Sequence, residues 1–172
     1  MRPSRKANRP GSGALSQGLL GFIAGAAASV AMTAAMRHLF SRLPDRERYP
    51  LPPREILDAL EPSPPAAGNR ALKTLLAHLG YGGLAGAVFA LLPQRPKGLL
   101  YGPAVWAISY LGWLPGLQIL RSARHHPSRR NGLMLIAHLV WGATLVRGLR
   151  ELEASRKDIF AEGRDRDHPT DL

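Results

Sequence analysis

Two histidines lie inside apolar runs that repeat one another sixty residues apart. The run LLAHLGYG at residues 75–82 returns as LIAHLVWG at residues 135–142. In each copy an aromatic residue follows the histidine after three places and a glycine after four, so a helix would put the histidine and the glycine on one face. An ionisable side chain inside an apolar helix is costly and often functional. His78 and His138 are therefore the first candidates for chemistry.

The histidine pair allows three interpretations. Each imidazole can simply hydrogen-bond a neighbouring helix and support packing. The pair can instead respond to pH, because burial and mutual repulsion both oppose protonation. Facing histidines with a glycine beside them can also ligate a haem or a metal ion. Replacing both histidines with glutamine would separate packing from a pH response, since glutamine keeps a hydrogen-bonding group but does not titrate.

Apolar runs long enough to cross a bilayer contain these histidines. Four stretches carry no Asp, Glu, Lys or Arg: residues 11–36, 74–94, 98–120 and 131–146. A spanning helix needs about 20 mostly apolar residues. Soluble helices normally keep a polar face, which disfavours a cytosolic bundle. The chain is therefore predicted to be an all-α integral membrane protein with four transmembrane helices, at about residues 14–40, 72–92, 98–120 and 131–149.

The polar parts of the sequence flank these runs. Residues 1–13 are basic and rich in Pro, Gly and Ser and predict a disordered arm, while residues 150–172 mix both charges and predict a disordered tail. Residues 52–61 predict a short amphipathic helix on the membrane surface. The membrane domain thus covers residues 14–149. The net charge of +11 comes from residues beside the apolar runs, which indicates anionic head groups and not nucleic acid.

Glycines spaced by four predict where helices pack. Gly21 and Gly25 in the first span, and Gly82 and Gly86 in the second, form GxxxG motifs that allow close approach of another helix. Similarities between the first and third spans, and between the second and fourth, indicate two helical hairpins that point the same way. The basic arm and the even number of spans predict that both termini are cytoplasmic.

Several short patterns resemble one family. The run RYPLPPRE at residues 48–55, AHLGYG at 77–82, the Tyr101-Gly102 pair with Trp106, and the His126-Pro127 pair with AHLVWG at 137–142 resemble the YagU-type family of small bacterial inner-membrane proteins. The resemblance covers about residues 15–150. It implies a multi-pass protein of the inner (plasma) membrane and a link with acid resistance. It implies no catalytic or binding residue.

The sequence contains no cysteine and no recognisable catalytic, phosphate-binding or zinc-binding motif. We therefore expect a non-enzymatic membrane protein without a cofactor or a metal centre, with the lipid bilayer as its surroundings. The first alternative is a small proton-linked transporter or channel that works as a homo-oligomer, because four helices leave little room for a pathway. The second alternative is a bis-histidine haem protein.

Overall fold

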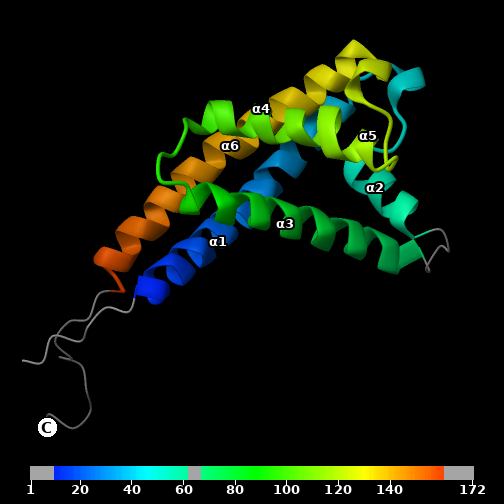
Figure 1. The fold of residues 1–172 in the computed structure, drawn as a ribbon. Coiled ribbons are helices and arrows are strands. Elements are labelled where there is room, and N and C mark those ends of the chain that lie inside the picture. Colours follow the sequence, from blue (N-terminus) through cyan, green and yellow to red (C-terminus); the bar gives the residue numbers. More distant parts are fainter. Residues whose placement is uncertain (1–9, 62–66, 161–172) are drawn as a thin grey trace, which may run out of the picture.

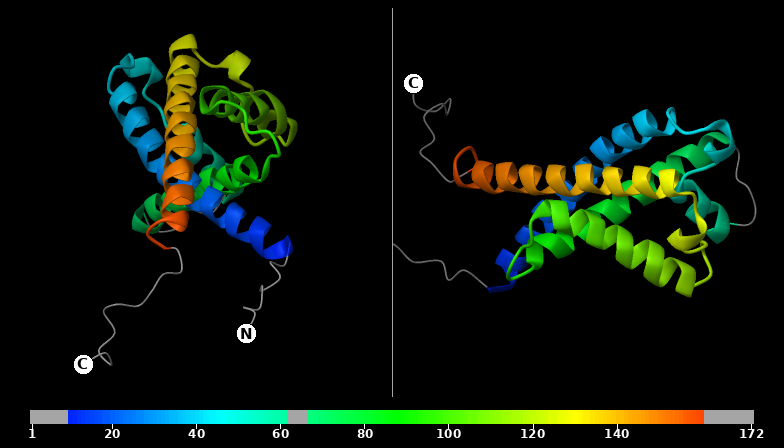
Figure 2. Two further views of the ribbon diagram at one scale, coloured as in Figure 1. Left: turned by 90° about the vertical axis from the view of Figure 1, so that its left-hand side faces the viewer. Right: turned by 90° about the horizontal axis from the view of Figure 1, so that it is seen from above.

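The computed structural model describes residues 10–61 and 67–160. The predicted disorder of residues 1–9 and 161–172 lies outside these ranges. Within them the chain is all-helical and contains no strand. Figures 1 and 2 show long helices that cross one another: α3 crosses α1 in Figure 1, and α1 crosses α6 in both views of Figure 2.

Three uninterrupted helices are long and apolar enough to cross a membrane. They are α1 (Pro10–Phe40), α3 (Ala67–Leu91) and α6 (Ser128–Lys157), with candidate spans Gly13–Phe40, Asn69–Leu91 and Ser128–Lys157. These three helices match the first, second and fourth predicted spans. The chain is therefore compatible with insertion into a membrane.

The third predicted span, residues 98–120, is not one regular helix. It consists of α4 (Gly98–Ala107), the π-helical η2 (Ile108–Trp113) and α5 (Leu114–Gly116). Pro115 has no amide hydrogen and cannot continue the α-helical ladder, and the π-helical turn ends two residues before it, at Trp113. The predicted end at residue 120 is wrong, because the helix stops at Gly116 and Gln118 adopts a left-handed backbone conformation with φ 58°.

The predicted ends of the outer helices also need correction. The helix α1 begins at Pro10 and not at residue 14, with a proline at its first position. The helix α6 begins at Ser128 and extends to Lys157, so its last turns occupy residues predicted to be tail. An ion pair of 2.8 Å between Arg147 and Glu151, one turn apart, supports this extension. The helix α3 likewise begins earlier than predicted, at Ala67.

The helices α1 and α3 are antiparallel and cross at the four predicted glycines. A methyl group added to Gly25 would overlap the carbonyl oxygen of Gly82, and one added to Gly86 would overlap that of Gly21. Only glycine permits such close contact between two backbones. The sequence motif therefore locates the crossing.

A second glycine crossing joins α4 to α6. A methyl group on Gly102 would overlap the carbonyl oxygen of His138, and Gly98 and Gly142 lie against one another. Gly142 of α6 thus packs against Gly98 and Gly102 of α4, just as Gly86 of α3 packs against Gly21 and Gly25 of α1. The sequence repeat pairs Gly142 with Gly82 instead. The second crossing is therefore shifted by one helical turn relative to the sequence match.

The buried core lies mainly between α1 and α6, whereas apolar side chains on the outside remain exposed. Fully buried core residues include Ala28 of α1 and Ala137, Leu145 and Leu149 of α6. Exposed apolar residues occur on α1, α3, α4 and η2: Leu19, Ile23, Val30, Leu76, Leu84, Val88, Leu99, Leu100, Ile108 and Leu111. An apolar exterior of this extent is typical of a surface that contacts lipid or another protein.

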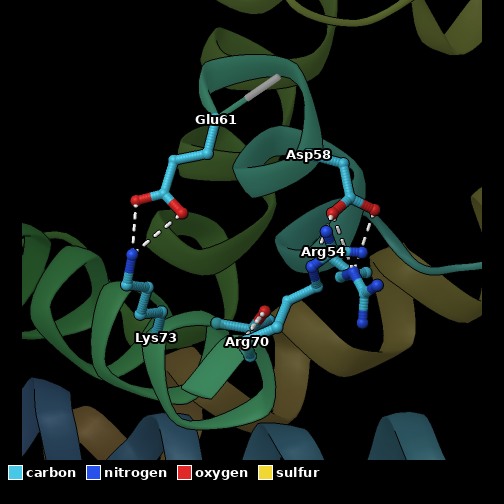
Figure 3. Close-up of polar contacts among 6 residues, drawn as sticks. Arg54, Asp58, Glu61, Arg70 and Lys73 are labelled. Carbon is cyan, nitrogen blue, oxygen red and sulfur yellow. Dashed lines mark hydrogen bonds and ion pairs between the residues drawn. The ribbon is translucent and has the colours of Figure 1, made fainter. Parts of the chain in front are cut away.

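The short helix α2 (Pro52–Leu60) lies at the ends of α3 and α5 (Figure 1). Ile56 packs with the small cluster of Tyr110 and Leu114. Polar contacts attach the opposite side of this segment to the first turns of α3 (Figure 3): Lys73 Nζ donates to Glu61 Oε1 at 2.8 Å, and Arg70 lies 3.8 Å from Asp58. The predicted amphipathic segment thus covers one end of the bundle.

Candidate functional site

A cavity of about 150 Å³ lies where α1, α3, α6, the α4–η2–α5 segment and α2 meet. Most of its lining is apolar or aromatic. The side chains facing it come from five parts of the chain: Ser29 and Met32; Pro52, Pro53 and Ile56; Ala77, His78, Tyr81 and Ala85; Val105, Trp106, Ser109, Tyr110, Trp113 and Leu114; and Met134, His138 and Trp141. A cavity of this size admits a molecule about as large as benzene.

The structure brings the two predicted histidines to this one cavity, from α3 and α6. The Nδ1 atom of His138 donates a hydrogen bond of 2.7 Å to the carbonyl oxygen of Met134. A carbonyl oxygen only accepts, so this bond assigns the proton to Nδ1 and leaves Nε2 as an acceptor in the neutral ring. His138 therefore has one nitrogen fixed by its own helix and one that remains available.

Two polar atoms of the cavity lining are buried without a hydrogen-bond partner in the part of the chain that the structure describes. They are Nε2 of His78, whose imidazole approaches the backbone of Ser29 without meeting hydrogen-bond geometry, and the indole Nε1 of Trp106. Leaving a buried polar group unpaired costs about 1–3 kcal/mol. A bound molecule that carries a hydrogen-bond acceptor would satisfy the indole N–H, and the imidazole can pair with either a donor or an acceptor.

The aromatic residue of each copy of the sequence motif connects the α1–α3 pair with the α4–α6 pair. Trp141 of α6 donates from Nε1 to the carbonyl oxygen of Gly25 in α1, at 3.1 Å. The hydroxyl of Tyr81 lies 2.7 Å from Ser109 Oγ in η2. Ser109 itself donates to the carbonyl oxygen of Val105, so Tyr81 is the donor in this pair. The motif therefore supplies two hydrogen bonds between these helix pairs, one donated from α3 and one from α6.

A buried arginine organises the chain beside the cavity. Arg130, in the first turn of α6, is only 3% exposed. Its guanidinium donates to the carbonyl oxygens of Glu47, Tyr49 and Pro50 at 3.0, 2.9 and 2.8 Å, and it lies 3.4 Å from the centre of the Tyr49 ring. These bonds hold the segment that leads into α2, whose residues close the cavity.

Glu55 of α2 lies near this arginine but does not form a short ion pair with it. Its Oε1 is 4.0 Å from Arg130 Nη2, and its Oε2 is buried without a partner among the described residues. Burial raises the pKa of the Glu55 carboxyl, and the positive charges of Arg130 and His126 offset only part of this rise. The segment over the cavity thus carries a carboxyl that is poorly solvated when ionised.

The predicted site residues lie at the cavity or at the helix crossing beside it. His78 and His138 line the cavity, while Gly21, Gly25, Gly82 and Gly86 form the α1–α3 crossing beside it. Sequence reasoning missed Arg130, which looked like one more basic residue before an apolar run, and the indole of Trp106. Among the described residues, no group of three or more His, Asp or Glu side chains is arranged to hold a metal ion.

Comparison with known proteins identified no relative of the chain. No protein-family model, curated protein or solved structure matches the chain. The resemblance to the YagU-type family therefore stays a prediction.

Proposed function

We propose that the chain is a multi-pass inner-membrane protein that acts by binding, and that the cavity with the two histidines holds a small, mostly apolar molecule carrying a hydrogen-bond acceptor. The observation that supports this most strongly is the pair of unpartnered atoms, His78 Nε2 and Trp106 Nε1, in an otherwise apolar cavity. Binding pockets for small molecules usually combine such a lining with a few polar groups that fix orientation.

The proposal includes four membrane crossings in two hairpins. The segment Gly98–Gly116 approaches the length of about 20 residues that a span needs, and it exposes Leu99, Leu100 and Ile108 as the other spans expose their apolar residues. The α1–α3 and α4–α6 pairs both cross antiparallel at glycines, which supports a repeat. The interrupted third span, α4–η2–α5, is acceptable in a bilayer because its irregular backbone lines a cavity.

The size of the cavity argues against the haem alternative. A volume of about 150 Å³ suits one benzene-sized ring, whereas a porphyrin joins four pyrrole rings. The predicted link with acid resistance stays a prediction, because it rests on the family resemblance. The apolar stretches of the described spans contain no acidic side chain. Proton-linked transport through carboxylates therefore has no support in these residues.

The cavity proposal predicts binding of 4-fluorophenol to the full chain in lipid nanodiscs, measured by ¹⁹F NMR against empty nanodiscs. Ala85 lines the cavity, so Ala85→Phe should fill it and weaken binding by roughly tenfold, or about 1.4 kcal/mol. Leu84, on the same helix, is 62% exposed, so Leu84→Phe adds a ring outside the cavity and should leave binding unchanged. Equal binding by both variants, with parent-like melting temperatures, would refute the assignment of the site.

The orientation is a separate prediction. The basic N-terminal arm and four crossings put both termini in the cytoplasm. We expect a C-terminal fusion to a reporter that works only in the cytoplasm to be active, and the matching fusion to a periplasmic reporter to be inactive. The reverse pattern would contradict the orientation without affecting the cavity.

A further inference from the structure

A second cavity, of about 440 Å³, lies at the opposite end of the bundle from α2. It is formed by the end of α3, the turn to α4, the first residues of α4 and the later turns of α6. Three basic residues, Arg95, Lys97 and Arg150, line it together with a single carboxylate, Glu153. Its remaining wall is apolar and includes Phe89, Leu99 and Val146.

The basic residues in this cavity differ in whether they already form an ion pair. Arg95 donates to Glu153 Oε1 at 2.9 Å and to the carbonyl oxygen of Ala90 at 3.1 Å. This arginine therefore balances Glu153, the one carboxylate among the described residues of the lining. Lys97 and Arg150 are exposed and make no ion pair with any described residue. Two positive charges at the mouth of the cavity thus remain available to an anion.

The position of the cavity along the helices matches the edge of a bilayer. The apolar part of α6 ends at Val146 and charged residues follow from Arg147, while the α3–α4 turn carries Arg95 and Lys97. A ligand in this place would have its charge at head-group depth and its apolar part against Leu99 and Val146. Basic pockets between membrane helices at this depth bind acidic lipid head groups.

We propose that this cavity is a binding site for an acidic phospholipid, with Lys97 and Arg150 holding the phosphodiester and Phe89, Leu99 and Val146 contacting the upper part of an acyl chain. The proposal rests on the membrane insertion proposed above, but it does not depend on the histidine cavity. A volume of about 440 Å³ exceeds the needs of a phosphate group alone and leaves room for the glycerol part of the lipid.

Native mass spectrometry of the full chain, released from nanodiscs that contain equal amounts of phosphatidylglycerol and phosphatidylcholine, tests the proposal. The parent should retain phosphatidylglycerol in preference to phosphatidylcholine. The variant Lys97→Gln/Arg150→Gln should lose this preference by roughly tenfold or more, because each of the two basic residues adds to the attraction for an anionic head group. Both side chains are exposed, so the variant should fold like the parent.

The matched control is Arg121→Gln/Arg124→Gln, which removes the same charge from exposed residues at the other end of the bundle. This control should keep the preference of the parent. An equal loss in both double variants would show that net charge and not this cavity attracts the lipid, and would overturn the proposal. Free glycerol 1-phosphate should fail to displace the lipid at equal concentration. Displacement there would mean that the site recognises phosphate alone, and would overturn the part assigned to the acyl chain.

Discussion

Gly25→Ala is expected to destabilise the protein strongly, although it adds only one methyl group. That methyl would overlap the carbonyl oxygen of Gly82 and also crowd Gly86 Cα, and both are backbone atoms that cannot rotate away. The two helices would have to separate, and overpacking of this kind typically costs about 1–3 kcal/mol or more. The melting temperature of the purified chain in detergent should fall accordingly. Gly142→Ala should have a similar effect, because its methyl would overlap the carbonyl oxygen of Gly98.

Gly80 provides a matched control in α3. A methyl group added at Gly80 meets no atom within 4 Å, so Gly80→Ala should be neutral or stabilise the helix by up to about 1 kcal/mol. Leucine at Gly21, Gly25, Gly82 or Gly86 should be at least as harmful as alanine. If Gly25→Ala and Gly80→Ala melted at the same temperature, α1 and α3 would not cross at these glycines.

Arg130→Met is expected to have the second large effect. The substitution keeps an apolar stem of similar length but leaves three carbonyl oxygens, of Glu47, Tyr49 and Pro50, without the donor that now serves them. Leaving a buried acceptor without its donor costs about 1–3 kcal/mol, and three carbonyl oxygens lose their donor here. Thermal unfolding in detergent should show a large fall in melting temperature. Binding of 4-fluorophenol should weaken as well, because the segment leading to α2 closes the cavity.

Arg129 is the control for this prediction. It precedes Arg130 and has the same charge, but it is exposed, so Arg129→Met should change the melting temperature little. Arg130→Lys should be intermediate, because a lysine keeps the charge but not the planar fork that reaches several carbonyl oxygens. Equal melting of the Arg129→Met and Arg130→Met variants would show that the bonds of Arg130 contribute nothing measurable.

The helices could be predicted because their signals are local. Runs without charge predicted three uninterrupted spans, and the four-residue spacing of Gly21, Gly25, Gly82 and Gly86 identified residues that form a helix crossing. The interruption after Ala107 could not be predicted in detail. A proline in the sequence shows that one helical hydrogen bond is missing. Whether the helix then kinks, forms a π turn or ends depends on the residues that pack around it.

The site could be predicted only in part. The duplicated motif singled out His78 and His138, which both line the cavity, because a repeated ionisable residue in an apolar run is visible in the sequence. The role of Arg130 could not be predicted, because its three carbonyl partners lie some eighty residues earlier in the chain. Backbone carbonyl groups leave no pattern of residue types in the sequence. The unpartnered indole of Trp106 is likewise a property of its surroundings and not of its sequence position.

Binding of 4-fluorophenol should be compared with binding of 4-fluorotoluene to test whether His78 and Trp106 recognise a polar group. The two compounds share a fluorinated ring, but one carries a hydroxyl where the other carries a methyl group. After correction for uptake by empty nanodiscs, the parent should prefer the phenol by roughly tenfold, since pairing a buried polar group contributes about 1–3 kcal/mol. The variant His78→Leu/Trp106→Phe removes both unpartnered atoms and should bind the two compounds equally. An unchanged preference in this variant would contradict the proposal that these atoms recognise the ligand.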